Sequence, residues 1–217
     1  MSDRSVSDTV TTDIPAVAEL VRDDQDRRAP GRPRSAKADE AIIEAVLDLL
    51  SEGSSIESLS IEAVANRAGV GKATIYRRWP NKETLVVDAI AVLKGPPAEV
   101  TGESVRDDLL ALLRPIGQSK STRAGRIMPC LIPEMQRNPE MARNYHKLME
   151  PRRQRMRDVL QRGIDSGQLR ADLNIDYVSA ILTGPMIAQA VLNWNPDLDT
   201  SKLPEHIVDT VLPGIVA

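Results

Sequence analysis

The 217-residue sequence has few of the residues that support a disulfide framework, a cysteine-rich metal site or an aromatic core. It contains one cysteine, Cys130, no phenylalanine, three tyrosines and two tryptophans. A single cysteine excludes an intramolecular disulfide and a cysteine-rich zinc site, and it fits a reducing cytoplasm best. With so few aromatic residues, the core must consist of Leu, Ile, Val, Ala and Met, which favours helices over β-sandwiches. We therefore expect an all-α protein.

Targeting signals and catalytic signatures are also missing. The N-terminus is polar and acidic without the apolar core of a signal peptide, and we expect no segment apolar enough to span a membrane, so a cytoplasmic location is expected. Cys130, His146 and His206 have no spacing typical of a catalytic triad or a metal site. No phosphate-binding or dinucleotide-binding glycine motif occurs. We expect no enzyme activity, no metal and no cofactor.

Charge is unevenly distributed although the formal net charge is only −3. Residues 1–26 carry two basic and seven acidic groups, residues 27–94 carry eleven and nine, and residues 95–217 carry fifteen of each. Residues 1–34 are expected to form a disordered tail, because their polar composition cannot offset the entropy of ordering. The tail ends in a basic arm, Gly-Arg-Pro-Arg, which taken alone is typical of a solvated linker.

Three helices are predicted between residues 35 and 80. The first covers about 35–51, because apolar residues recur there with helical spacing. The second covers about 60–69, from an N-cap serine to a terminating glycine, and the third begins at Lys72 and is halted by Pro80. Two short helices joined by a tight glycine turn are typical of a helix-turn-helix.

The side chains of this unit suit contact with DNA. Between Asn66 and Lys82 there are five basic residues and no acidic one, so we expect a cationic surface while Ile75 and Trp79 face inward. Lys82 follows the expected N-cap Asn81, at the positive end of a helix dipole, where a bound phosphate would be favourable. Small, hydrogen-bonding and cationic side chains are of the types that bind bases in the major groove or the phosphates beside it. The residues expected to face outward are Lys72, Ala73, Thr74, Tyr76 and Arg77.

The stretch SIEAVANRAGVGKATIYRRWPNKETL, from Ser60 to Leu85, resembles the DNA-binding signature of the TetR family. Together with the first helix, the resemblance covers about residues 36–90. It implies a DNA-binding head of three helices, a fourth helix that links it to an all-α ligand-binding body, and a homodimer on a palindromic double-stranded DNA operator. Applied to this sequence, the resemblance implies a helix-turn-helix domain over 35–80 and a ligand-binding and dimerisation domain over 81–217, with 81–93 as the connector.

The resemblance also assigns roles to individual residues. Trp79 stands where the family usually has phenylalanine, and we interpret it as a core residue. In this context the basic arm, with Arg32 and Arg34, is a candidate for an adjacent minor groove as well as for a solvated linker. The recognition helix would contain Lys72, Ala73, Thr74 and Arg77, and the phosphate-contacting positions would be Ser60, Tyr76 and Lys82.

Prolines and glycines divide the remaining sequence into helical segments. We expect an interruption at Pro129 and Pro133, and Pro151 as the first residue of a new helix. Five arginines between 152 and 162 alternate with acidic residues and are interpreted as a solvated face rather than a second nucleic-acid site. The predicted helices lie near 102–118, 121–136, 138–149, 151–166, 174–194 and 203–213.

The segment from Asp176 to Trp194 is apolar on nearly all sides. A helix on the outside of a monomer would not be, so we expect one side to pack on the body and another, with the last helix, to meet a second subunit. In TetR-like proteins the last two helices form the dimer. The expected interface residues are Ile187, Val191, Ile207, Val208, Val211 and Leu212.

The body is also expected to hold an unidentified small-molecule effector. Methionines and tyrosines supply adaptable apolar surface, and two amides could orient a polar group, although a methionine at helical spacing is more often a core residue than part of a ligand site. The candidate residues are Met128, Met135, Tyr145, Met149, Tyr177, Met186, Gln189 and Asn193.

The sequence therefore predicts a ligand-responsive, sequence-specific DNA-binding regulator, with repression expected from the family and activation left open. An effector in the body would move the connector and change the spacing of the two heads. Two alternatives remain open: an architectural DNA binder without sequence preference, and a small-molecule-binding or helical interaction module with weak DNA binding.

Overall fold

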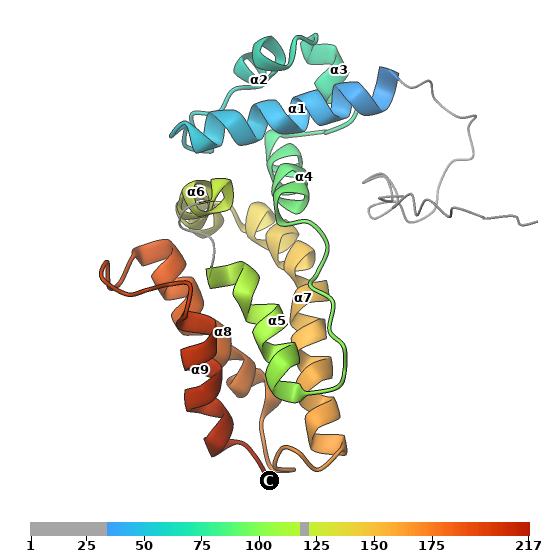
Figure 1. The fold of residues 1–217 in the computed structure, drawn as a ribbon. Helices are drawn as coiled ribbons and strands as arrows, with labels where there is room; N and C mark the ends of the chain where they lie inside the picture. The colour runs from blue at the N-terminus through green and yellow to red at the C-terminus, as the bar shows by residue number, and fades with distance from the viewer. Residues whose placement is uncertain (1–33, 118–121) are drawn as a thin grey trace, which may run out of the picture. The chain divides into compact units, whose positions relative to one another are not determined.

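All regular elements in the described part of the chain are helices, which confirms the all-α prediction. The computed structural model describes residues 34–117 and 122–217 (Figure 1). Arg32 and the predicted tail before Arg34 lie outside the described residues, and of Arg34 only the backbone is described, as the first residue of a helix. The helices are α1 (Arg34–Ser51), α2 (Ile61–Ala68), α3 (Lys72–Tyr76), α4 (Lys82–Lys94), α5 (Val105–Gly117), α6 (Arg123–Arg137), α7 (Pro139–Asp165), α8 (Ile175–Leu192) and α9 (Leu203–Val211).

Local capping sets the turn between α2 and α3. The Oγ of Ser60 accepts a hydrogen bond from the backbone N–H of Ala63 at 3.1 Å, which satisfies one donor of the first turn of α2. Gly69 ends α2 with a φ of 66°, a left-handed conformation that glycine adopts without a Cβ clash. Its N–H donates to the carbonyl of Asn66 at 3.3 Å. The chain can therefore reverse between the two helices within a few residues, as the sequence predicts.

The buried apolar residues form two clusters. The head cluster joins the side chains of α1 to α4 with Ile127 and Leu131 of α6 and Met141 of α7. The body cluster joins α5, the C-terminal half of α7, α8 and α9. The predicted division at residues 80 and 81 is crossed by the head cluster, to which α4 contributes Leu85, Val86, Val87, Ala89 and Ile90. The connector is thus packed as part of the head.

Three prolines that were expected to interrupt helices lie inside them. Pro129 and Pro133 are within α6, and Pro151 is within α7, which runs unbroken from Pro139 to Asp165. All three side chains are exposed, so the backbone groups that lose their helical partners lie on a side that water reaches. Packing holds α7 on both sides of Pro151, through Met141 in the head cluster and Val159 in the body cluster. The predicted helix start at Pro151 is therefore wrong.

The helix α8 is more apolar than expected from the sequence. Its 18 residues have a mean hydropathy of 1.4 and are long enough to cross a bilayer by length and composition alone, so the expectation of no such segment is wrong. One helix of this kind is weak evidence for a membrane. Val178, Leu182 and Met186 on one side of α8 pack into the body cluster, whereas Tyr177 and Ile181 on the opposite side are exposed among the residues that the structure describes.

Candidate DNA-binding surface and effector region

The exposed side of α3 carries the predicted residues. Ile75 is completely buried, whereas Tyr76 is 55% exposed, and Thr74 is half-buried. Since α3 has only five residues, its orientation depends on Ile75 and on Trp79, which follows the helix. The backbone N–H of Trp79 donates to the Ile75 carbonyl at 3.0 Å. The remaining outward side chains are those of Lys72, Ala73 and Arg77.

Two of the five basic residues in this unit bind acidic side chains elsewhere in the head. Arg67 donates two hydrogen bonds of 2.8 Å to the carboxylate of Glu52, and these lower the pKa of Glu52. Arg78 is paired with Asp39 of α1 and also donates to the Thr74 carbonyl at 3.0 Å. The charges of Arg67 and Arg78 are therefore compensated by acidic side chains within the head, although Arg67 remains exposed.

The other three cations are Lys72 and Arg77, on α3 or directly after it, and Lys82, at the start of α4. Lys72 lies 2.7 Å from Glu62, and this exposed pair holds the pKa of Glu62 below its usual value through the hydrogen bond from Lys72. Within the described residues, Arg77 makes no ion pair. The Nζ of Lys82 donates to the backbone carbonyl of Glu57 at 3.1 Å, so its positive charge meets a dipole rather than a carboxylate. Lys72, Arg77 and Lys82 are therefore the cations of this unit that suit phosphate or guanine contacts.

The start of α4 has the geometry of an anion-binding helix end. Asn81 is the N-cap, and its Oδ1 accepts from the N–H of Thr84 at 2.8 Å and from the Thr84 hydroxyl at 2.7 Å. Lys82 is the first residue of the helix, where a cation opposes the helix dipole. A phosphate placed here would be attracted by both the dipole and Lys82. Ser60 is also exposed, and while its oxygen accepts the capping bond, a hydroxyl group can at the same time donate its hydrogen to a phosphate.

Trp79 joins the helix-turn-helix to α4. It is buried in the head cluster, as predicted, and its indole N–H donates to Oδ2 of Asp88 at 2.8 Å. Burial of Asp88 raises the pKa of its carboxyl group, and the hydrogen bond from Trp79 offsets part of this rise. No local sequence pattern indicates this bond, because its acceptor lies in the middle of the next helix.

Replacing Asp88 with asparagine should make the protein more stable than the wild type, by an amount that grows as the pH rises. Because the pKa of Asp88 is raised in the folded state, its contribution to the free energy of unfolding is fully present below the ordinary pKa of aspartate. This contribution is lost as the pH rises through the folded-state pKa. Asparagine keeps an oxygen for the Trp79 N–H but cannot ionise. Urea melts of both proteins from pH 4 to pH 8 measure the difference in unfolding free energy. A difference that does not change with pH would contradict the assignment.

The eight candidate effector residues occupy separate places. Met128, Met135 and Tyr145 pack half-buried against the head cluster, Met186 is buried in the body cluster, and Met149 belongs to neither. Tyr177 is 72% exposed on the outer side of α8, and Asn193 is the C-cap of that helix. Gln189 is buried, and its amide bonds the backbone of Asn195 at 2.7 and 3.0 Å, so it closes the loop after α8.

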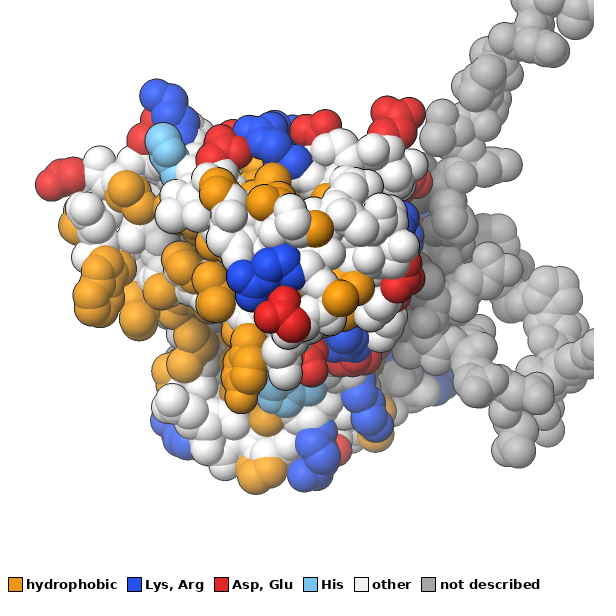
Figure 2. Space-filling model, turned by 90° about the horizontal axis from the view of Figure 1, so that it is seen from below, with side chains coloured by type: hydrophobic (Ala, Val, Ile, Leu, Met, Phe, Trp, Pro, Cys, Tyr) orange, Lys and Arg blue, Asp and Glu red, His pale blue; other side chains and the backbone are white. Residues whose placement is uncertain are grey.

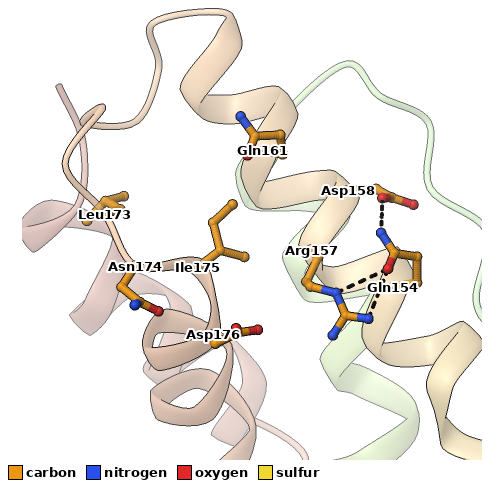
Figure 3. A pocket seen from close by; sticks show the side chains of 8 residues that line it. All are labelled: Gln154, Arg157, Asp158, Gln161, Leu173, Asn174, Ile175 and Asp176. Atoms are coloured by element: carbon orange, nitrogen blue, oxygen red, sulfur yellow. Dashed lines mark hydrogen bonds between the residues drawn. The ribbon is translucent and has the colours of Figure 1, made fainter.

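An open hollow of about 500 Å³ lies between α7 and the start of α8 (Figure 3). Three of its polar side chains bond one another: Gln154 donates to Asp158 at 2.7 Å, and Arg157 donates to Gln154 at 2.9 and 3.1 Å. None of the predicted effector residues is part of it. The residues that line the hollow are Gln154, Arg157, Asp158, Gln161, Leu173, Asn174, Ile175 and Asp176.

The predicted dimer residues separate into two groups. Ile187 is exposed on α8, and Val191, Val211 and Leu212 are half-buried. In contrast, Ile207 and Val208 of α9 are buried in the body cluster of their own protomer, so the expectation that they face a second subunit is not supported. The apolar side of α9 is short, and it packs against α5 and α8 of the same protomer.

An apolar patch nevertheless covers the outer side of α8. Figure 2 shows hydrophobic side chains gathered along the edge where Figure 1 places α8 and α9. The residues that form the patch, here called the α8 face, are Tyr177, Ile181, Ile187, Leu192 and Trp194, of which Trp194 is 79% exposed. A contiguous exposed patch of large apolar side chains is typical of a surface that another molecule covers.

Three arginines of α7 form ion pairs, and a fourth, Arg152, binds backbone carbonyls. Arg157 is paired with Glu150, and Arg153 lies 3.6 Å from the same carboxylate, as expected of a solvated face. Arg162 instead pairs with the buried Asp108. Arg152 turns toward the end of α4.

These features define a helix-turn-helix DNA-binding protein. A fixed, exposed α3 carries cations and small side chains, and a helical body is packed beneath it. The family profile described as "Bacterial regulatory proteins, tetR family" matches residues 42–89, and that described as "Tetracyclin repressor-like, C-terminal domain" matches residues 100–211.

Similar proteins agree with these matches. The HTH-type transcriptional regulator YdeS of Bacillus subtilis is 30% identical over 75% of this chain and 82% of its own length. The crystal structure of the TetR family transcription regulator SCO0332 is 29% identical, with a TM-score of 0.63 over 82% of this chain and 98% of that one. The regulator FadR of Bacillus subtilis, crystallised with stearoyl-CoA, has a TM-score of 0.64 at 16% identity over 81% of this chain and 98% of that one.

The chain belongs to the TetR family of transcriptional regulators. Members of this family bind DNA operators and act as dimers. The relatives named above are described as transcriptional regulators.

Proposed function

We propose that this protein is a cytoplasmic repressor that binds an inverted-repeat operator as a homodimer and is released by a small-molecule effector. The observation that carries the proposal is the α3 surface: Lys72, Ala73, Tyr76 and Arg77 are exposed on a helix whose orientation is fixed by buried Ile75 and Trp79. Two such heads in a dimer read two half-sites related by twofold symmetry.

The packing of the head on α4 and α6 supports a response to an effector. Ile127 and Leu131 of α6 share the head cluster with α1 and α4. The guanidinium of Arg123, also on α6, donates to Glu44 at 2.6 Å and to Asp48 at 2.7 Å, both on α1. A ligand that binds better to one arrangement of α4 and α6 would therefore bias the position of the head. The FadR structure with stearoyl-CoA supports the view that this fold can hold a small molecule, at the level of fold analogy.

Replacing Arg123 with glutamine should loosen the head from α6. The change removes a cation that bonds two carboxylates, and we expect a loss of about 1 kcal/mol of unfolding free energy because the partners are partly exposed. Urea melts at low salt measure it, and about 1 M NaCl should reduce it. The matched control is Arg126→Gln, which removes an arginine from an exposed position of the same helix, α6. An equal effect of both changes would contradict the role of Arg123.

The proposed function is tested by selecting bound sequences from random duplex DNA at about 0.15 M salt. The wild type and a Lys72→Ala, Tyr76→Ala double variant are compared. We expect a twofold-symmetric motif for the wild type and none for the variant, in which two exposed side chains of the α3 surface are lost. Binding without enrichment would favour an architectural DNA binder. Negligible binding by a folded dimer would favour an interaction or small-molecule-binding module.

A further inference from the structure

A second group of cations lies away from the DNA-binding surface, where the end of α4 meets the middle of α7. Lys94 is the last residue of α4, and the Arg152 guanidinium of α7 donates to the backbone carbonyls of Lys94, at 3.2 Å, and Gly95. Both side chains are half-buried. Tyr145 and Met149 precede Arg152 on α7 with a spacing that places all three on one face of the helix. We call Lys94, Tyr145, Met149 and Arg152 the α4–α7 seam.

The seam has positive charge without a matching acid. Neither Lys94 nor Arg152 has a carboxylate partner among the residues that the structure describes. Burial lowers the pKa of Lys94, and the nearby charge of Arg152 lowers it further. Burial likewise lowers the pKa of Arg152. Two half-buried cations that repel each other destabilise the protein unless an anion lies near them.

A hydroxyl and an apolar surface accompany these cations. Burial raises the pKa of Tyr145, although the charges of Arg153 and Arg152 oppose the rise, so its hydroxyl keeps its proton at neutral pH and can donate to an anion. Tyr145 packs against the head cluster, while Met156, further along α7, belongs to the body cluster. Met149 lies between them and belongs to neither cluster. The apolar packing is therefore interrupted at the level of the cations.

We propose that the α4–α7 seam binds a small organic anion, whose carboxylate or phosphate group contacts Lys94 and Arg152 and whose apolar part lies along Tyr145 and Met149. The inference deepens the proposed function, because a ligand there touches α4, the helix that carries part of the head cluster. The competing explanation is purely structural: Lys94 would interact with the negative end of the α4 dipole, and Arg152 would only cap its carbonyls.

Thermal melts with three probes distinguish these explanations. The probes are decanoate, decyl phosphate and the uncharged decan-1-ol, tested on the wild-type protein, on Lys94→Met and on Arg152→Gln, which keeps donors for the α4 carbonyls. The matched control is Lys147→Met, an exposed lysine on α7. We expect at least one of the two anions to raise the wild-type melting temperature more than the alcohol does, and the preferred anion identifies the head group.

The variants should weaken that anion's apparent affinity by about 10- to 100-fold, because a charged hydrogen-bond partner is lost. Lys94→Met without a probe should melt at or above the wild-type temperature, and Lys147→Met should bind like the wild type. The proposal is overturned if neither anion stabilises the wild type more than the alcohol does. It is also overturned if Lys94→Met melts lower than the wild type and keeps its anion affinity.

Operator binding separates this inference from the proposed function. Fluorescence anisotropy with the selected duplex should show weaker wild-type binding when the stabilising anion is present and no change for Lys94→Met. A wild type that binds the operator but none of the anions overturns the seam proposal and leaves the repressor proposal intact. A wild type that binds an anion through Lys94 but binds no operator overturns the repressor proposal and leaves the seam proposal intact.

Discussion

Replacing Lys72 and Arg77 together with alanine is expected to lower the affinity for the selected operator by about 10²- to 10⁴-fold. Both side chains are exposed on α3 or directly after it, and a side chain that contacts a base or phosphate contributes about 1–3 kcal/mol. If both residues contact phosphates, the dependence of log affinity on log salt should also fall by about two. Fluorescence anisotropy over a range of salt concentrations measures both quantities.

The matched control for this change is Lys147→Ala with Arg155→Ala. These two residues are exposed on α7, and their loss changes the net charge by the same amount. If the control weakened binding as much as the α3 variant, the effect would come from overall charge rather than from a DNA-binding surface. Because Glu62 is exposed, loss of its partner Lys72 should leave the melting temperature almost unchanged.

Aspartate at both Ile181 and Ile187 should dissociate the dimer. The two residues are 55% and 50% exposed in the protomer, so the protomer should still fold. In a dimer that covers the α8 face, each substitution would bury a carboxylate without a partner, at a cost of several kcal/mol. We expect the dissociation constant of the dimer to rise by at least about 10³-fold, as measured by sedimentation equilibrium.

Two further measurements complete this test. A control with Gln136→Asp and Gln161→Asp adds the same charge at exposed positions of α6 and α7 and should remain a dimer. The α8 variant should also lose operator affinity, since one head alone cannot occupy both half-sites. A variant that remains dimeric at micromolar concentration would show that the α8 face is not the interface.

The head was predictable because its signals are local. Ser60 caps the helix that it precedes, Gly69 allows the left-handed turn, and Ile75 and Trp79 recur at helical spacing and are buried together. These features depend on neighbours within a few residues, so a sequence pattern contains them. The residues that the pattern placed outward on α3 are accordingly the ones that the structure exposes or leaves half-buried.

The roles that could not be predicted depend on partners far away in the sequence. Nothing near Arg67 or Arg78 indicates that Glu52 and Asp39 will neutralise them. Pro151 resembles a helix start because a proline inside a helix removes a backbone hydrogen bond, and this cost can be read from the sequence. The packing that keeps α7 continuous across Pro151 cannot be read from the local sequence. An apolar pattern such as that of Val208 indicates burial but does not tell a subunit interface from the core of the protomer.

The two tryptophans of the chain report on different parts of the molecule. Trp79 is buried in the head beside a carboxylate, and Trp194 is an exposed member of the α8 face. Indole fluorescence shifts to shorter wavelength when water is excluded from the ring, so the two emit at distinguishable wavelengths. Subunit association should alter the red-shifted emission of Trp194, whereas loosening of the head should alter that of Trp79. The wild-type protein thus contains a natural optical probe for each half.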